Sequence, residues 1–161
     1  MTDPEISFEP LKAELIANVL DIERASFVDP WGEHHFMREI LSPSSYFVVM
    51  RAYTELVGYG GYWLTGNEAH ITNVAIDPKR RRQGLGKKLV THLLRSAATA
   101  GTRSASLEVR VSNVPAQRLY ASLGFVEVAI HPGYYLESGE DAIVMWKRSL
   151  GQHQPEDRSD D

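Results

Sequence analysis

Apolar and polar positions follow two rhythms along this chain, one typical of strands and one typical of helices. Segments rich in β-branched and aromatic residues, typical of strands, occupy 46–51, 56–64 and 69–76, after a short alternation at 6–8. The connections between the three longer segments are short and polar, and Thr65-Gly66-Asn67-Glu68 is typical of a hairpin. We therefore expect three consecutive antiparallel strands.

Apolar residues three and four positions apart, the helical spacing, recur in four further segments. These are 11–27, 36–41, 84–100 and 116–123. Asp29-Pro30-Trp31-Gly32 separates the first two, and Gly101 and Gly124 follow the last two as helix stops. With later strands at 105–111, 125–130 and 142–146, the order predicts an α/β fold with a mixed sheet.

Length and composition limit the functions open to this fold. The 161 residues are 43% hydrophobic, enough for one domain, which we place at 1–150, followed by a disordered acidic tail at 151–161. The net charge of −4 argues against nucleic acid as the partner of the whole protein. No cysteine is present, which excludes disulfides and Cys-ligated zinc, and the spacing of His34 and His35 predicts no metal site.

No apolar run approaches the roughly 20 residues that cross a membrane, and the N-terminal residues do not resemble a signal peptide. We therefore expect a cytoplasmic protein without membrane attachment, as a monomer or weak dimer.

The segment 73–89 carries the most distinctive chemistry, because an apolar strand, a basic turn and a helix follow one another directly. A helix N-terminus has unpaired N–H groups and the positive end of the helix dipole. Gly84 and Gly86 lack side chains, so an anion can approach the amides of residues 82–87. The spacing fits neither a P-loop nor a Rossmann motif. A phosphate cradle is one interpretation, and a solvated basic face is the other.

Arg81-x-x-Gly84-x-Gly86 after an apolar strand resembles the acetyl-CoA motif of the GNAT superfamily of N-acetyltransferases. The segments 107–113, 116–125 and 133–142, with Pro30-Trp31, resemble its RimI branch, and the likeness extends from Ile6 to Lys147. The resemblance implies the GNAT fold, with a mostly antiparallel sheet of about seven strands and about four helices. It also implies acetyl-CoA as co-substrate and a protein N-terminus as acceptor. In bacteria that acceptor is the N-terminal alanine of small-subunit ribosomal protein number eighteen.

The same resemblance assigns two catalytic roles. Glu108 becomes the general base that deprotonates the acceptor amine, whereas the residues alone favour an ion pair with Arg110. Tyr120 becomes the acid that protonates the leaving thiolate, whereas its spacing alone favours a core aromatic.

Binding residues follow from the same motifs. For the cofactor they are Val74, Ala75, Ile76, Arg81, Arg82, Gln83, Gly84, Leu85, Gly86, Lys87 and Asn113. Asn113 is in any case a good helix cap, and any of the four basic residues at 79–82 is a candidate for the phosphate contact. Trp31, Tyr134 and Tyr135 are candidates for the peptide groove or, equally, lids over the core.

Two other functions remain open at this point. One is an acetyltransferase for lysine side chains or small amines. The other is a non-catalytic acetyl-CoA-binding module, against which the presence of both Glu108 and Tyr120 argues.

Overall fold

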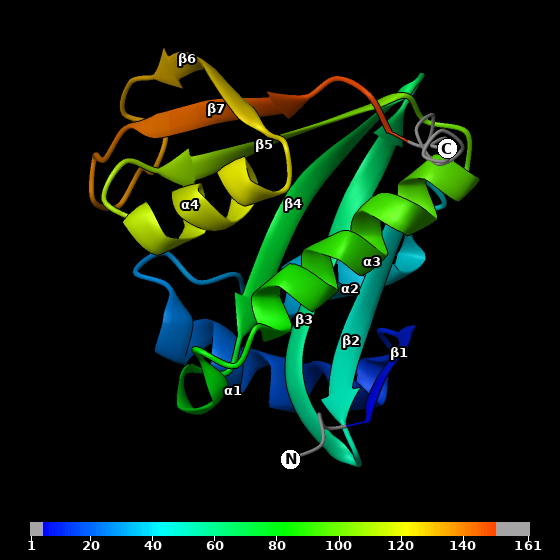
Figure 1. Ribbon diagram of the computed structural model, residues 1–161. Helices are drawn as coiled ribbons and strands as arrows, with labels where there is room; N and C mark the ends of the chain where they lie inside the picture. Colours follow the sequence, from blue (N-terminus) through cyan, green and yellow to red (C-terminus); the bar gives the residue numbers. More distant parts are fainter. Residues whose placement is uncertain (1–4, 151–161) are drawn as a thin grey trace.

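The computed structural model describes residues 5–150, so the acidic tail expected at 151–161 lies outside the described residues. Seven strands form one sheet in the order β1-β2-β3-β4-β5-β7-β6 (Figure 1). The strands are β1 (Ile6–Pro10), β2 (Ser45–Ala52), β3 (Glu55–Thr65), β4 (Glu68–Ile76), β5 (Ser104–Arg110), β6 (Val126–His131) and β7 (Ala142–Lys147). The expected mixed α/β sheet is confirmed.

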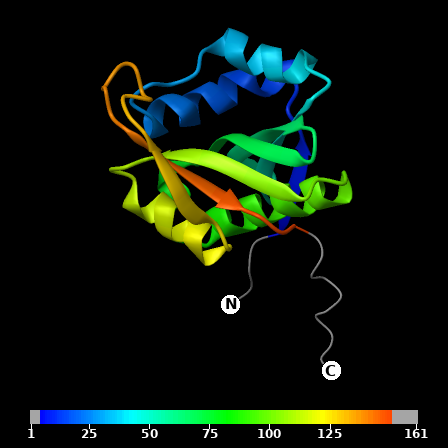
Figure 2. The ribbon, with the colours of Figure 1, turned by 90° about the horizontal axis from the view of Figure 1, so that it is seen from above.

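Helices cover both faces of this sheet. They are α1 (Ile16–Ser26), α2 (Glu33–Leu41), α3 (Leu85–Thr99) and α4 (Val114–Ser122), with short 3-10 helices η1 (Ala13–Leu15) and η2 (Pro78–Arg80). Figure 2 shows α1 and α2 on one side of the sheet and α3 and α4 on the other. The core is accordingly divided: Leu89 and Leu93 of α3 pack on one face, and Val19 of α1 and Phe36 of α2 pack on the opposite face.

The strand pairing explains where a ligand can enter. Neighbouring strands are antiparallel except β4 and β5, which run parallel and pair only over Glu68–His70 and Ser104–Ser106. Beyond His70 the two strands diverge (Figure 1). The segment of β4 from Ile71 to Ile76 therefore has a strand partner, β3, on one edge only.

Local sequence sets the helix starts on either side of this divergence. Gly84 lies in the left-handed region at φ 75° as the residue before α3, a conformation that favours glycine. The side chain of Asn113 accepts a hydrogen bond of 3.2 Å from the N–H of Ala116, so the predicted cap of α4 is confirmed. The first predicted helix instead begins with the 3-10 turn η1 and becomes α-helical at Ile16.

Candidate active site

Glu108 lies on β5 just past the point where the parallel pairing with β4 ends. Its Oε1 is 2.7 Å from Nε2 of His70 on β4, and the hydroxyl of Tyr134 donates a longer hydrogen bond of 3.5 Å to the same oxygen. The ion pair with Arg110 that the sequence alone favours is absent from the ion pairs of residues 5–150. Glu108 therefore faces an imidazole and a phenol.

A shallow hollow in the sheet surface surrounds this pair. Its lining residues are Thr65, Glu68, His70, Ser106, Glu108, Val144 and Trp146. Glu68 accepts a short hydrogen bond from the hydroxyl of Ser106, which keeps a second carboxylate beside His70. The side chain of His70 is 33% exposed and that of Glu108 is 20% exposed, so water reaches both. Sequence reasoning missed His70, because only the register of β4 against β5 brings it to Glu108.

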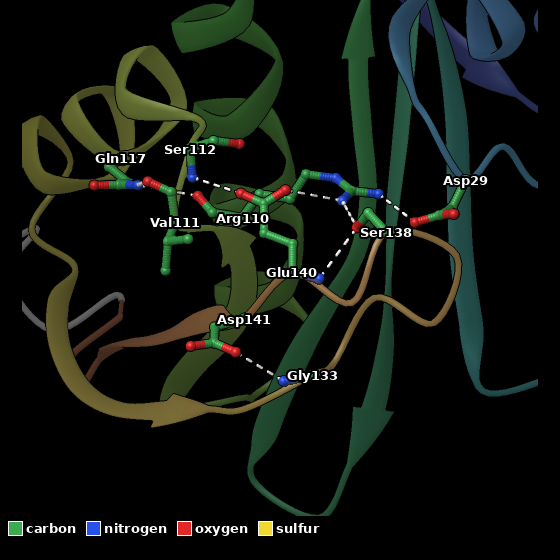
Figure 3. A network of polar contacts seen from close by, with 9 residues as sticks. All are labelled: Asp29, Arg110, Val111, Ser112, Gln117, Gly133, Ser138, Glu140 and Asp141. Carbon is green, nitrogen blue, oxygen red and sulfur yellow. Dashed lines mark hydrogen bonds and ion pairs between the residues drawn. The ribbon is translucent and has the colours of Figure 1, made fainter.

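Arg110 joins three segments that are far apart in the sequence (Figure 3). Its guanidinium donates to Oδ2 of Asp29 in the α1–α2 connection at 2.5 Å, and to Oε1 of Glu140 in the β6–β7 connection at 3.1 Å. Glu140 also accepts from the N–H of Ser112. The side chain of Ser112, then this N–H and then Arg110 lower the pKa of Glu140. The network therefore ties the α1–α2 and β6–β7 connections to β5.

A buried carboxylate on α1 connects this helix to β3, β4 and the α1–α2 connection. Glu23 of α1 is 1% exposed and accepts hydrogen bonds from the hydroxyl of Tyr59, the amide of Asn73 and the N–H of Trp31. Burial raises its pKa above 4.5, against the opposite effect of the three donors. Glu23 thus ties the Trp31 loop to β4. Its position among apolar residues of α1 gave no sequence signal for this role.

The three aromatic residues predicted for a peptide groove have different surroundings. Trp31 is half-buried and packs against Phe36, with ring centroids 5.2 Å apart, so it also covers the core. The guanidinium of Arg110 lies over the ring of Tyr135, with its central carbon 3.9 Å from the ring centroid. Tyr134 is 37% exposed and reaches Glu108. Among the three, Tyr134 is placed next to the predicted base.

Tyr120 lies on the other side of β5 from Glu108. It is 8% exposed, its ring packs edge-on against Phe125 at 5.7 Å, and burial raises its pKa to about 12. Its hydroxyl has no hydrogen-bond partner among residues 5–150. Within these residues, Oδ1 of Asp29 is the only side-chain nitrogen or oxygen atom that is fully buried without a partner, so the Tyr120 hydroxyl does not belong to that class. The Tyr120 hydroxyl is therefore buried but not completely enclosed. A phenol that stays protonated at neutral pH has the form that a general acid requires.

The turn before α3 has the features of an anion site. The first hydrogen bond of the helix runs from the N–H of Lys88 to the carbonyl of Gly84 at 3.3 Å, which leaves the amides of Leu85, Gly86 and Lys87 without helical acceptors. A side chain at Gly84 would meet no atom within 4 Å, so this position is open. At Gly86, by contrast, a Cβ would lie 3.3 Å from Leu119 Cδ2, so this glycine also permits close packing of α3 against α4.

The basic residues of the turn differ in their partners. Arg80 pairs with Glu55, and Arg81 donates to the carbonyl of Ile76 at 3.4 Å and to the hydroxyl of Ser26 at 3.3 Å. Arg82 is exposed, forms no ion pair within residues 5–150, and has a positive φ of 67°. Arg82 and Lys87, like Lys79 and Lys88, are exposed and form no ion pair within residues 5–150, so they are free to meet an anion.

The described residues hold no group of three or more His, Asp or Glu side chains placed to bind a metal ion. None of the helices between residues 5 and 150 is long and apolar enough to cross a bilayer.

Comparison with known proteins identifies the family to which this chain is similar. Residues 16–125 match the acetyltransferase (GNAT) family. A Bacillus subtilis (strain 168) protein, whose name makes it a candidate [ribosomal protein bS18]-alanine N-acetyltransferase, is 40% identical over 137 residues, 84% of this chain and 91% of its own length. The N-alpha-acetyltransferase RimI of Mycobacterium tuberculosis is 36% identical over 135 residues, 80% of this chain and 84% of its own.

A solved structure agrees with these sequence relatives. The crystal structure of the ribosomal-protein-S18-alanine N-acetyltransferase from Escherichia coli has a TM-score of 0.82 and 30% identity to this chain, covering 91% of this chain and 95% of its own. The likeness thus covers most of the length of both chains.

Proposed function

This chain belongs to the GNAT family of acetyltransferases, and on that premise we propose that it moves an acetyl group from acetyl-CoA to the α-amino group of a protein N-terminus. The acceptor we propose is the N-terminal alanine of ribosomal protein bS18, the acceptor in the names of the relatives from Bacillus subtilis and Escherichia coli. A ribosomal protein as partner accords with the proposed cytoplasmic location.

The observation that carries the proposal is the position of Glu108. Its carboxylate lies beside the divergence of β4 and β5, with Oε1 held by His70 and Oε2 without a partner among residues 5–150. An N-terminal ammonium has a pKa near 8 and must lose a proton before the amine can attack a carbonyl carbon. A carboxylate with one free oxygen at the acceptor side of the sheet is suited to take that proton.

The cofactor side of the same divergence fits acetyl-CoA. When bound, acetyl-CoA supplies a thioester whose carbonyl carbon accepts the amine. We assign the free amides at the start of α3, with Arg82 and Lys87, to the binding of its phosphates. We assign the unpaired edge of β4 around Val74–Ile76 to hydrogen bonds with the rest of the cofactor. We assign Tyr120 to protonation of the leaving thiolate, whose pKa lies near that of a Cys thiol.

Peptide acetylation distinguishes this function from its rivals. We expect acetylation of a peptide bearing the bS18 N-terminal sequence with a free alanine, and none of an N-blocked peptide that contains lysine. Preference for the lysine peptide or for a polyamine would refute the assignment. In addition, mass spectrometry of ribosomal proteins from a strain that lacks the gene should find bS18 with an unacetylated N-terminus, and unchanged acetylation would contradict the proposed acceptor.

A further inference from the structure

The strongest unassigned feature is the contact between His70 and Glu108. The distance of 2.7 Å between Nε2 and Oε1 is that of a charge-assisted hydrogen bond. The two residues come from strands that pair for three residues and then separate, so the contact closes the narrow end of the divergence. Packing alone does not explain a histidine there, because it lies in an open hollow with the polar residues Glu68, Ser106 and Glu108, beside Val144 and Trp146.

We propose that His70 is a positioning residue for acetyl transfer. It fixes Oε1 of Glu108 and so leaves Oε2 to the acceptor amine. His70 and Glu108 then share the proton that the amine loses. This inference rests on the proposed function, because it assigns a role in the same reaction.

The geometry around Glu108 supports the division between its two oxygens. Oε1 is engaged by His70 and, at 3.5 Å, by the hydroxyl of Tyr134. Oε2 has no partner within residues 5–150 and is not among the fully buried side-chain atoms there, so it faces solvent. A carboxylate that is held through one oxygen has less rotational freedom, so its second oxygen stays available in one orientation.

The charges around His70 support its part in holding the proton. Glu108 faces it from β5, Glu68 lies two residues away on the same face of β4, and Tyr134 contributes a neutral phenol from the β6–β7 connection. The hydrogen bond to Glu108, with smaller effects of both carboxylate charges, raises the pKa of His70 above 6.5. An imidazole that titrates in this range gives and takes a proton close to neutral pH.

The proton balance is simple. In the reactive form, Glu108 is a carboxylate and His70 a neutral imidazole, so the pair has one negative charge. The ammonium N–H bond breaks, its electron pair stays on nitrogen, and the proton makes the pair neutral overall. Water in the hollow lined by Glu68 and Ser106 then receives the proton, which restores the reactive form.

The decisive activity experiment uses His70→Gln. Glutamine can donate an N–H to Oε1 of Glu108, but it does not titrate. For the wild-type protein, we expect kcat at saturating peptide and acetyl-CoA to rise with pH through the ionisation of the pair. In His70→Gln that rise should disappear, and the plateau kcat should fall on the order of 10-fold. An unchanged pH profile would overturn the proposal, because a purely structural side chain would not set it.

His92→Gln is the matched control. His92 lies on α3, where it contacts the Tyr46 hydroxyl at 2.9 Å and stacks on Phe8, on the opposite side of the sheet from the hollow. The same substitution there should leave the pH profile of kcat as in the wild-type protein.

A titration by NMR tests the pair without any turnover. The imidazole of His70 should titrate above 6.5 in the wild-type protein and at a lower pH in Glu108→Gln, which removes the partner charge. Equal titration in both proteins would overturn the inference. If the wild-type protein acetylated no N-terminal peptide while the NMR shift was present, the proposed function would fail and the His70–Glu108 pair would stand.

Discussion

Replacing Gly61 by alanine tests how the strand pairing positions the acceptor side of the site. Gly61 of β3 faces Asn73 of β4 at the irregularity where the register shifts. A Cβ at Gly61 would lie 2.3 Å from Cδ2 of Phe47 and 2.6 Å from the carbonyl oxygen of Tyr46. Both distances are too short for carbon contacts, and the oxygen belongs to the backbone of β2, so it cannot move independently of the sheet.

The expected loss follows from two opposing effects. Overpacking a filled core costs about 1–3 kcal/mol, and contacts this short belong at the upper end of that range. Alanine in a strand interior regains about 0.5–1 kcal/mol relative to glycine. We therefore expect Gly61→Ala to lower the free energy of unfolding by about 2 kcal/mol, which for a chain of this length corresponds to about 4–8 °C in Tm.

Gly60→Ala is the neighbouring control. At Gly60 a Cβ would lie 3.1 Å from the carbonyl oxygen of Asn73 and 3.3 Å from a methyl of Leu93, distances that require shifts of a few tenths of an ångström. Thermal unfolding followed by circular dichroism should show a clearly smaller loss for this variant. Equal losses for the two variants, or a Gly61→Ala protein as stable as the wild type, would refute the steric argument.

The same change has a functional consequence. Phe47 packs against Trp31, with ring centroids 6.2 Å apart, and Trp31 is in the loop that we place beside the acceptor peptide. Displacement of the Phe47 ring should therefore raise KM for the peptide more than KM for acetyl-CoA in Gly61→Ala. A change confined to KM for acetyl-CoA would contradict this link from Gly61 through Phe47 to Trp31.

Three further predictions address the catalytic and cofactor residues. Glu108→Gln and Tyr120→Phe should each lower kcat by about 10²–10⁴-fold in steady-state peptide acetylation, and intact turnover in both would exclude the proposed acid–base roles. Gly84→Ala should cost about 1–2 kcal/mol, because φ is 75° there, and should raise KM for acetyl-CoA; an unchanged KM would argue against the anion site. Because the folded pKa of His70 is raised above 6.5, its stabilising effect is fully present below that pH and is lost as pH rises through the raised value. The difference in Tm between wild type and His70→Gln should therefore shrink from about pH 6 to about pH 8, and a constant difference would refute the linkage.

The hydrophobic pattern was sufficient for the order and type of the elements. The hairpin at Thr65–Glu68 joins β3 and β4, and the helical spacing at 84–100 corresponds to α3. These features are local, because side-chain periodicity and turn residues act over a few positions. The glycine and arginine motif before α3 was visible for the same reason, since its residues are contiguous.

The tertiary structure decided which side chains meet. The sequence favoured Arg110 as the partner of Glu108, two residues away on the same strand face, but Arg110 binds Asp29 and Glu140 instead. His70 lies 38 positions before Glu108, and the register of one short parallel pair brings them together. Non-local pairing of this kind depends on how strands are ordered and aligned in the sheet, which no local pattern specifies. The sequence by itself therefore determined the elements and the glycine and arginine motif before α3, whereas the arrangement around Glu108, including the buried links of Glu23, was determined only by the assembled sheet.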